Sequence, residues 1–238
     1  MSTAIITGGA VRIGKALALH LASIGFNIAL HYHSSGKEAL KAIQEIKSLG
    51  VKAKAYSLDF TMLEKIPKLI KNIHNDFPDT NLLINSASDF LKGEIKQTSN
   101  KKLLSNMQVN LLAPFILMRE YQKEIASGHI INILDQSINK GLPKHAAYSV
   151  SKAALSHLTT LAVSEYAPKI RVNALALGLI LPKAGQDEHF FKQQKKQITL
   201  QKTETIEALL KGLDYLINNS SVSGKILSIE GIEAKTRS

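Results

Sequence analysis

Short apolar runs alternate with stretches of helical periodicity from one end of the 238-residue chain to the other. Seven of these runs are predicted strands, at 3–7, 27–32, 51–59, 81–85, 128–134, 170–177 and 225–229. Between them, apolar residues recur at helical spacing over 13–24, 36–49, 63–77, about 98–126 and 147–167. Strands that alternate with helices predict an α/β fold, a doubly wound domain with a seven-stranded parallel sheet and right-handed crossovers. Since no linker or repeat divides the chain, residues 1–238 are predicted to form a single domain.

The first predicted strand runs directly into a glycine-rich turn, TGGAVRIG at 7–14. Small residues such as Gly8 and Gly14 let the backbone approach a pyrophosphate, and the helix that opens near Ile13 supplies N–H groups and the positive end of its dipole. An ordinary tight turn also uses glycine, so it is the placement between first strand and first helix that favours a dinucleotide site. We expect a Rossmann-type domain in which Gly8, Arg12, Ile13 and Gly14 lie against the cofactor phosphates.

The second predicted strand ends in HYHSS at 31–35, which contains no acidic residue. An acid at this point hydrogen-bonds the ribose 2′-hydroxyl of NAD. Here the side chains of His33, Ser34 and Ser35 are donors, which suits a 2′-phosphate, so the predicted cofactor is NADPH/NADP rather than NADH. Asp59 ends the third strand and has two interpretations, an acid near the adenine or a turn or helix-cap acid.

Tyr148 and Lys152 lie four residues apart on a predicted helix and therefore share one of its faces. A nearby cation favours the phenolate, so we expect Lys152 to lower the pKa of Tyr148 and make it a usable proton donor. Such a pair is common by chance. The pair becomes significant because Asn110 lies upstream and the whole chain has the expected α/β pattern.

In this order, the glycine turn, the segment NSAS at 85–88, Asn110, the Tyr148/Lys152 pair and RVN at 171–173 resemble the short-chain dehydrogenase/reductase family over essentially the whole chain. The resemblance implies that Tyr148 donates a proton, that Lys152 binds the nicotinamide ribose beside Tyr148, and that Asn110 holds a water. It also implies a homotetramer and an acid near the adenine at Asp59. The remaining cofactor-binding residues that it implies are Asn85, Ser86 and Ala87.

Four features depart from the usual family pattern, and one of them is the segment at 85–88, which is NSAS rather than NNAG. Arg12 stands where the middle glycine of the turn is usual, and Asp135 stands thirteen residues before Tyr148, where the family has serine. Ser137 lies two positions too late and is interpreted as a bystander. Leu177 and Gly178 replace the usual proline-glycine after the sixth strand.

Arg12, the HYHSS strand end, NSASDF at 85–90 and Asp135 together resemble the pteridine reductases, in particular the bacterial dihydromonapterin/dihydrofolate reductase branch. A carboxylate would repel a developing alkoxide, but it accepts hydrogen bonds from the amino and ring N–H groups of a pterin. The resemblance implies NADPH-dependent reduction of a dihydropterin C=N bond, with a pterin or folate as the substrate. Its predicted substrate-binding residues are Arg12, Ser88, Phe90, Asp135 and Tyr148.

Several interpretations stay open. Phe90 is either a stacking platform or ordinary core, and Asp135 is either catalytic or a structural strand-end acid. The chain is alternatively a carbonyl reductase acting on a ketoacyl or sugar substrate, or an inactive NADPH-binding regulator. A substrate loop is expected at about 181–203, where Phe190 and Phe191 either close over a ligand or form the apolar face of a short helix.

The composition of the chain excludes several kinds of site and partner. Cysteine is absent, which excludes disulfides, thiolate metal sites and cysteine nucleophiles. The formal charge of +11 raises the possibility of nucleic-acid binding, but the lysines are dispersed, as on a solvated surface. No apolar run reaches the roughly 20 residues that cross a bilayer. We therefore expect a cytoplasmic protein with no nucleic-acid, membrane or metal partner.

Overall fold

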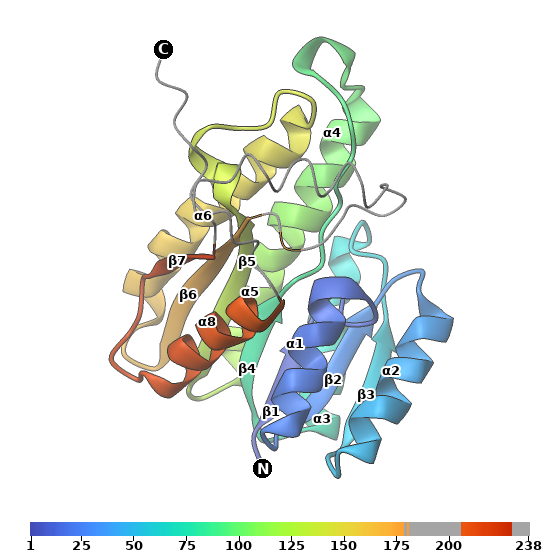
Figure 1. Cartoon of the computed structure of the whole chain (residues 1–238), viewed down its shortest axis with the longest axis vertical. Helices are drawn as coiled ribbons and strands as arrows, with labels where there is room; N and C mark the ends of the chain where they lie inside the picture. The colour runs from blue at the N-terminus through green and yellow to red at the C-terminus, as the bar shows by residue number, and fades with distance from the viewer. Residues whose placement is uncertain (179, 181–205, 230–238) are drawn as a thin grey trace.

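A computed structural model describes residues 1–178, 180 and 206–229 of the chain. Its centre is a seven-stranded, entirely parallel sheet in the order β3-β2-β1-β4-β5-β6-β7 (Figure 1). The strands are β1 (Thr3–Ile6), β2 (Asn27–Tyr32), β3 (Ala53–Ser57), β4 (Thr80–Asn85), β5 (Gly128–Asp135), β6 (Ile170–Leu177) and β7 (Ile226–Ile229). The predicted doubly wound α/β fold is confirmed.

Helices cover both faces of this sheet (Figure 1). On one face lie α1 (Arg12–Ser23), α2 (Gly36–Ser48) and α8 (Ile206–Asn218). On the other lie α3 (Ile66–Asp76), α5 (Ala113–Glu124) and α6 (Ala146–Tyr166), with α4 (Asn100–Met107) beside α6. The other helical segments within the described residues are short: η1 (Leu63–Lys65), η2 (Ile95–Gln97), η3 (Gln108–Leu112) and η4 (Gln136–Asn139).

Each strand sends alternate side chains into two separate cores. In β1, Ala4 and Ile6 join the cluster beneath α1, α2 and α8, whereas Ile5 joins the cluster beneath α3, α5 and α6. Both faces of the strand are therefore shielded from solvent. For this reason its sequence is a continuous apolar run rather than an alternation of apolar and polar residues.

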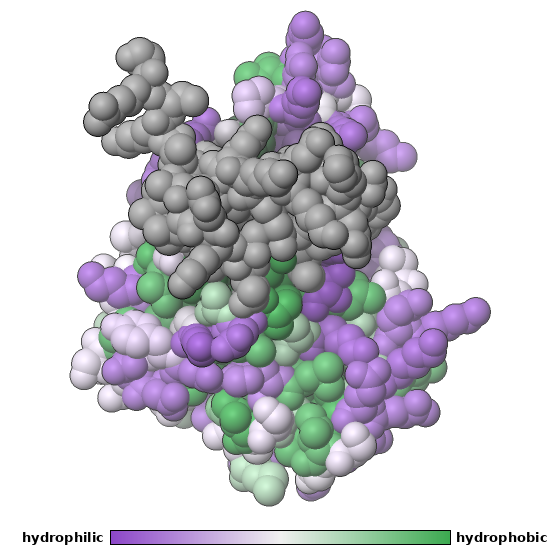
Figure 2. Space-filling view, viewed as in Figure 1, coloured by the Kyte–Doolittle hydropathy of each residue, from purple (hydrophilic) through white to green (hydrophobic). Residues whose placement is uncertain are grey.

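The surface over α1, α2 and α8 is largely hydrophilic, with apolar residues interspersed (Figure 2). On α2 the buried side chains, such as Ala39 and Ile46, recur on one side of the helix. The rest is mostly charged or polar, with Leu40 exposed among these residues. This is the solvated surface that the dispersed lysines predicted. Within the described part of the chain, no helix has the length and apolar character to cross a membrane.

The predicted helical stretch of about 98–126 is confirmed over 100–124, where the π-helical segment η3 joins α4 and α5 without a break. Helix α8 was not predicted, although Leu209, Leu213 and Leu216 recur at helical spacing and are buried. The loop expected at 181–203, with Phe190 and Phe191, lies outside the described residues.

The strand order reverses between β1 and β4, because the chain winds first toward β3 and then toward β7. In parallel sheets of this kind, ligands bind beyond the carboxyl ends of the strands at the point of reversal. The loops after β1 and β4 are therefore the place to look for a site.

Candidate active site

The turn after β1 depends on close backbone packing. Gly8 has φ +64°, and a Cβ atom at this position would lie 2.9 Å from the Cα of Ala87. A Cβ at Gly14 would lie 2.2 Å from the carbonyl oxygen of Gly8. Arg12, at the N-terminus of α1, has φ +52° and an exposed side chain. A non-glycine residue in this left-handed conformation costs about 1 kcal/mol, so the arginine is retained at some cost in stability.

A buried histidine that the sequence did not single out supports this turn. The Nδ1 of His31 accepts a hydrogen bond from the Gly8 N–H (3.3 Å), and its Nε2 lies 2.9 Å from the Leu58 carbonyl oxygen. The imidazole also stacks on Phe60, with ring centroids 3.9 Å apart. Burial, aided by the charge of His33 and opposed by the Leu58 contact, lowers the pKa of His31 to about 4. At neutral pH the ring is therefore uncharged, with its proton on Nε2.

Thr7 connects the turn to the segment after β4. Its Oγ1 accepts hydrogen bonds from the N–H groups of Ser86 and Ala87, both at 2.9 Å, and donates to the Ile84 carbonyl at 3.4 Å. The two loops that flank the point of strand reversal are thus held together by one hydroxyl.

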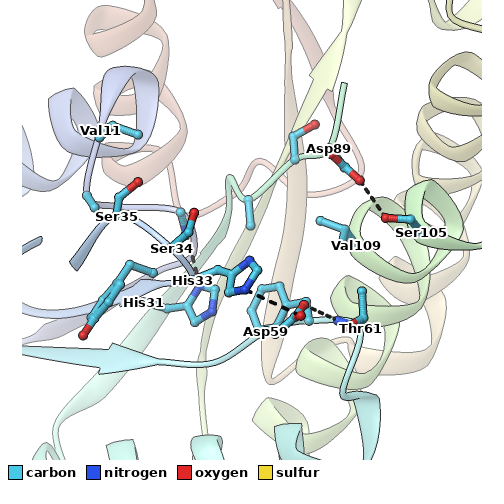
Figure 3. A pocket seen from close by; sticks show the side chains of 16 residues that line it. Val11, His31, His33, Ser34, Ser35, Asp59, Thr61, Asp89, Ser105 and Val109 are labelled. Atoms are coloured by element: carbon cyan, nitrogen blue, oxygen red, sulfur yellow. Dashed lines mark hydrogen bonds and ion pairs between the residues drawn. The ribbon is translucent and has the colours of Figure 1, made fainter. Parts of the chain in front are cut away.

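A groove of about 470 Å³ opens beside these loops (Figure 3). His33 and Asp59 meet in it, with Nε2 3.5 Å from Oδ2. A hydrogen bond from the Thr61 N–H lowers the pKa of Asp59, so this carboxylate remains charged. The groove is lined by Gly8, Ala10, Val11, His31, Tyr32, His33, Ser34, Ser35, Asp59, Phe60, Thr61, Ala87, Ser88, Asp89, Ser105 and Val109.

Six predicted cofactor residues are thereby brought to one groove. They are Gly8, His33, Ser34, Ser35, Asp59 and Ala87. Arg12, Ile13, Gly14 and Ser86 flank the same turn without lining the groove.

Asn85, another predicted cofactor residue, points elsewhere. Its side chain is buried between strands and donates from Nδ2 to the Asn132 Oδ1 at 2.8 Å, while its own Oδ1 has no hydrogen-bond partner among the described residues. The side chain of Asn85 thus packs within the sheet.

Asp135, the last residue of β5, meets Tyr148 of α6. The Tyr148 hydroxyl donates to the Asp135 Oδ2 at 3.0 Å, and the other carboxylate oxygen accepts from the backbone N–H and the hydroxyl of Ser137. Burial, and then the charge of Asp135 and this hydrogen bond, raise the pKa of Tyr148 above its ordinary value. The pKa of Tyr148 therefore moves in the opposite direction to the one expected from Lys152.

Lys152 lies on the same side of α6, only 2% exposed. Its Nζ donates to the Ile133 carbonyl at 2.8 Å and lies 5.9 Å from the centre of the Tyr148 ring. Burial lowers the pKa of Lys152 to about 8, against the opposing influence of Asp135. The group is therefore still mostly protonated at pH 7 and contributes a buried positive charge next to the Asp135–Tyr148 pair.

Phe90 packs against the ring of Tyr148. Its own ring stands edge-on to Tyr148 at 4.5 Å between centroids, and it stacks on His145 at 3.9 Å. His145 in turn contacts the Leu91 carbonyl through Nδ1 at 3.1 Å. Phe90 is thus part of an ordered aromatic cluster and is only partly exposed.

Asn110 lies in the π-helical segment η3 and is fully buried. Its side chain pairs with the backbone of Asp89 in both directions, accepting from the N–H at 2.8 Å and donating to the carbonyl at 2.9 Å, and it reaches the Ser151 hydroxyl at 3.1 Å. Asn110 therefore fixes the chain between Ser88 and Phe90, next to the Tyr148-bearing helix. The role of holding a water stays a prediction.

Comparison with known families decides the classification, because residues 2–193 match the model described as short chain dehydrogenase. The chain belongs to the short-chain dehydrogenase family. Dihydromonapterin reductase from Enterobacter sp. strain 638 is 26% identical over 232 residues, which are 95% of this chain and 94% of that protein. A 2-dehydro-3-deoxy-D-gluconate 5-dehydrogenase from Pseudoalteromonas atlantica is 33% identical over 181 residues, 74% of this chain and 71% of that protein.

Solved structures give the same family assignment. The crystal structure of FolM alternative dihydrofolate reductase 1 from Brucella canis, complexed with NADP, superposes with a TM-score of 0.92. It is 30% identical, and the match covers 98% of this chain and 93% of that one.

Sequence reasoning missed three residues of this short-chain dehydrogenase site. Thr7 and His31 act through hydrogen bonds to residues far along the chain, which no local pattern displays. Ser137 was set aside as a bystander, yet it contacts Asp135 directly. Only for Ser137 was a signal available, because a serine two residues after an aspartate commonly closes a local side-chain-to-backbone turn. The described residues contain no cluster of histidines and carboxylates able to hold a metal ion.

Proposed function

We propose that this chain reduces the C=N bond of a dihydropterin, such as dihydromonapterin or dihydrofolate, to the tetrahydro form with NADPH as reductant. The observation that carries the proposal is the contact between the Asp135 carboxylate and the Tyr148 hydroxyl, beside the buried ammonium of Lys152. The names of the dihydromonapterin reductase relative and of the Brucella canis structure agree with it.

The groove fits NADPH. Gly8 leaves no room for a side chain against Ala87, so the turn offers bare backbone to a pyrophosphate. His33, Ser34 and Ser35 present donors at the end of β2, which suit a 2′-phosphate, and Lys152 would hold the nicotinamide ribose. When bound, NADPH supplies the hydride, and the protein has to supply position and a proton.

The proton supply suits a nitrogen better than a carbonyl oxygen. Because the pKa of Tyr148 is raised, its hydroxyl stays protonated across the physiological range but is a weak acid. An imine nitrogen is far more basic than a ketone oxygen and accepts a proton from a weaker acid. Tyr148, relayed by Asp135, can therefore deliver a proton to the imine nitrogen of the pterin ring as the hydride reaches the imine carbon. The C=N double bond thereby becomes a single bond, and each of its two atoms gains one hydrogen.

Asp135 also serves recognition. A carboxylate accepts hydrogen bonds only, and a pterin presents an amino group and a ring N–H as donors. We assign Phe90 and Ser88 to the wall of the pterin site, since Asn110 fixes the segment that carries both residues. Arg12, exposed at the start of α1, would face the same ligand from the glycine turn.

Carbonyl reduction is the second candidate, favoured by the 33% identity to a dehydrogenase named for a sugar acid. The carboxylate of Asp135 opposes it, because the charge that develops on a carbonyl oxygen would lie next to an anion that hydrogen-bonds to the proton donor itself.

Steady-state kinetics of the purified chain separates the two candidates. We expect NADPH oxidation with dihydromonapterin and dihydrofolate, with kcat/KM above that for a ketoacyl thioester or a keto sugar acid. Turnover confined to the carbonyl substrates would overturn the proposal. Tight NADPH binding without turnover on any of these substrates would instead indicate a regulatory protein.

A further inference from the structure

We propose that Ser137 is a positioning residue that sets which oxygen of Asp135 takes part in the reaction. This inference rests on the proposed function, in which the proton of Tyr148 reaches the imine nitrogen by way of Asp135. Ser137 itself touches no reacting atom.

The two oxygens of Asp135 have separate partners. Oδ1 accepts from the Ser137 N–H at 2.8 Å and from the Ser137 hydroxyl at 2.5 Å, while Oδ2 accepts from Tyr148 at 3.0 Å. A carboxylate oxygen has two lone-pair directions. Ser137 therefore fills Oδ1 completely, and Oδ2 keeps one lone pair beyond its bond to Tyr148.

Ser137 is itself held in place. Its carbonyl oxygen accepts from the N–H groups of Lys140 and Gly141, at 3.0 and 2.7 Å, which closes the turn that follows β5. The hydroxyl therefore stands next to Asp135 without further ordering, and its hydrogen bond is as short as those to an ionised carboxylate normally are. Ser137 therefore fixes Oδ1 of the carboxylate by hydrogen bonds, while Oδ2 can still accept one more.

This arrangement has a consequence that a purely structural serine would lack. Without the Ser137 hydroxyl, Oδ1 of Asp135 would keep only the Ser137 N–H as a donor, and the carboxylate would be freer to rotate away from Tyr148. The change should affect the proton-transfer step and not the binding of the cofactor.

The test compares the full-length protein with Ser137→Ala, which removes the hydroxyl, and Ser137→Thr, which retains it. Ser149→Ala is the matched control, because the Ser149 hydroxyl accepts from the Leu142 N–H in the same loop and does not contact Asp135. The first readout is NMR of aspartate 13C-labelled at the side-chain carboxyl, with the Asp135 signal assigned by Asp135→Asn. It needs no turnover.

At a fixed pH, we expect the carboxyl carbon signal of Asp135 to change position in S137A, because one hydrogen bond to Oδ1 is lost, while S137T and S149A keep the wild-type position. The second readout is steady-state kinetics with a dihydropterin in H2O and in D2O. S137A should lower kcat about tenfold, increase the solvent isotope effect on kcat and leave the KM for NADPH unchanged. An S137A signal and isotope effect that match the wild type, or an equal change in S137T or S149A, would overturn the role of Ser137. If the signal changes but the wild type lacks dihydropterin turnover, the proposed function fails and the contact of Ser137 with the carboxylate stands.

Discussion

The hydroxyl of Tyr148 donates its hydrogen bond to Asp135 across 3.0 Å, so the proton donor of this site is coupled to a carboxylate. On the same helix, Lys152 supplies a buried positive charge that interacts with Asp135. The pKa of Tyr148 is nevertheless raised, by burial first and then by Asp135. Under the proposed function, this pair favours transfer of the proton to a basic atom, such as the nitrogen of a C=N bond.

Replacing Tyr148 with Phe should remove the proton donor and leave the ring packing intact. We expect kcat for a dihydropterin to fall roughly 10²- to 10⁴-fold, the range for loss of a general acid, with NADPH affinity nearly unchanged. Steady-state kinetics and fluorescence titration with NADPH measure the two effects. Tyr215→Phe, on the exposed surface of α8, is the matched control and should behave as the wild type. Residual activity of Y148F near the wild-type level would assign the proton to another group.

Replacing Asp135 with Ser restores the residue usual in the family. We expect kcat/KM for dihydropterins to fall about 100-fold, because the proton relay and a pterin acceptor are both lost. Activity on a ketone should rise from a low baseline, because the hydroxyl can donate to a developing alkoxide. Asp79→Ser changes the same residue type at an exposed position and controls for the loss of charge. A D135S variant as active on dihydropterins as the wild type would make the carboxylate structural only.

Introducing an acid at the end of β2 should change the choice of cofactor. Ser34 is exposed and lines the groove next to His33. An aspartate there would repel a 2′-phosphate and accept from a 2′-hydroxyl, so Ser34→Asp should lower the NADPH-to-NADH ratio of kcat/KM by about tenfold or more. Ser48→Asp, at the opposite end of α2, should leave the ratio unchanged. A wild type that uses NADH as well as NADPH would already contradict the assignment of the donors at 33–35.

Stability should depend on pH through His31. Its pKa is lowered from 6.5 to about 4, so the folded state resists protonation while the unfolded state does not. The stability that neutral His31 contributes is fully present above pH 6.5 and is lost as the pH falls toward 4, by about 3 kcal/mol over that range. His31→Gln should therefore be less stable than the wild type by about 2 kcal/mol at pH 7, since Gly8 and Leu58 lose well-placed partners.

Urea unfolding of the wild type and H31Q at pH 7, 5.5 and 4 checks this expectation. The wild-type advantage should shrink as the pH falls and reverse near pH 4, because the loss of about 3 kcal/mol exceeds the advantage of about 2 kcal/mol and glutamine does not titrate. His157→Gln, an exposed position on α6, should show no such trend. If the free energy of unfolding of the wild type exceeds that of H31Q by the same amount at every pH, burial does not keep His31 neutral.

The sequence predicted those parts of the molecule in which the deciding contacts are local. β5 and β6 are buried on both faces and therefore appear as mainly apolar runs, interrupted by the buried Asn132 and Asn173. Tyr148 and Lys152 share a helix face that their spacing reveals. The α8 pattern was equally local and was overlooked. The turn TGGAVRIG was visible because glycine is needed at Gly8 and Gly14 for steric reasons.

The rest of the site depends on contacts between distant segments. The stack of His31 on Phe60 and the pairing of Asn110 with the Asp89 backbone require the fold to be known. Asn85 lies in a recognisable segment, and its contact with the cofactor stays a prediction. Its side chain donates to Asn132 on the neighbouring strand, which the motif did not indicate. A motif therefore located the segment correctly and left the direction of the side chain undetermined.

Transfer of deuterium from NADPH labelled with deuterium at C4 of the nicotinamide ring tests the central claim most directly. The product of the reaction with a 7,8-dihydropterin is examined by NMR and mass spectrometry. We predict one deuterium on the former imine carbon of the tetrahydropterin, at a rate that falls in Y148F and in D135S. Unlabelled dihydropterin recovered unchanged, with deuterium appearing only on the carbinol carbon of a ketone substrate, would contradict the account.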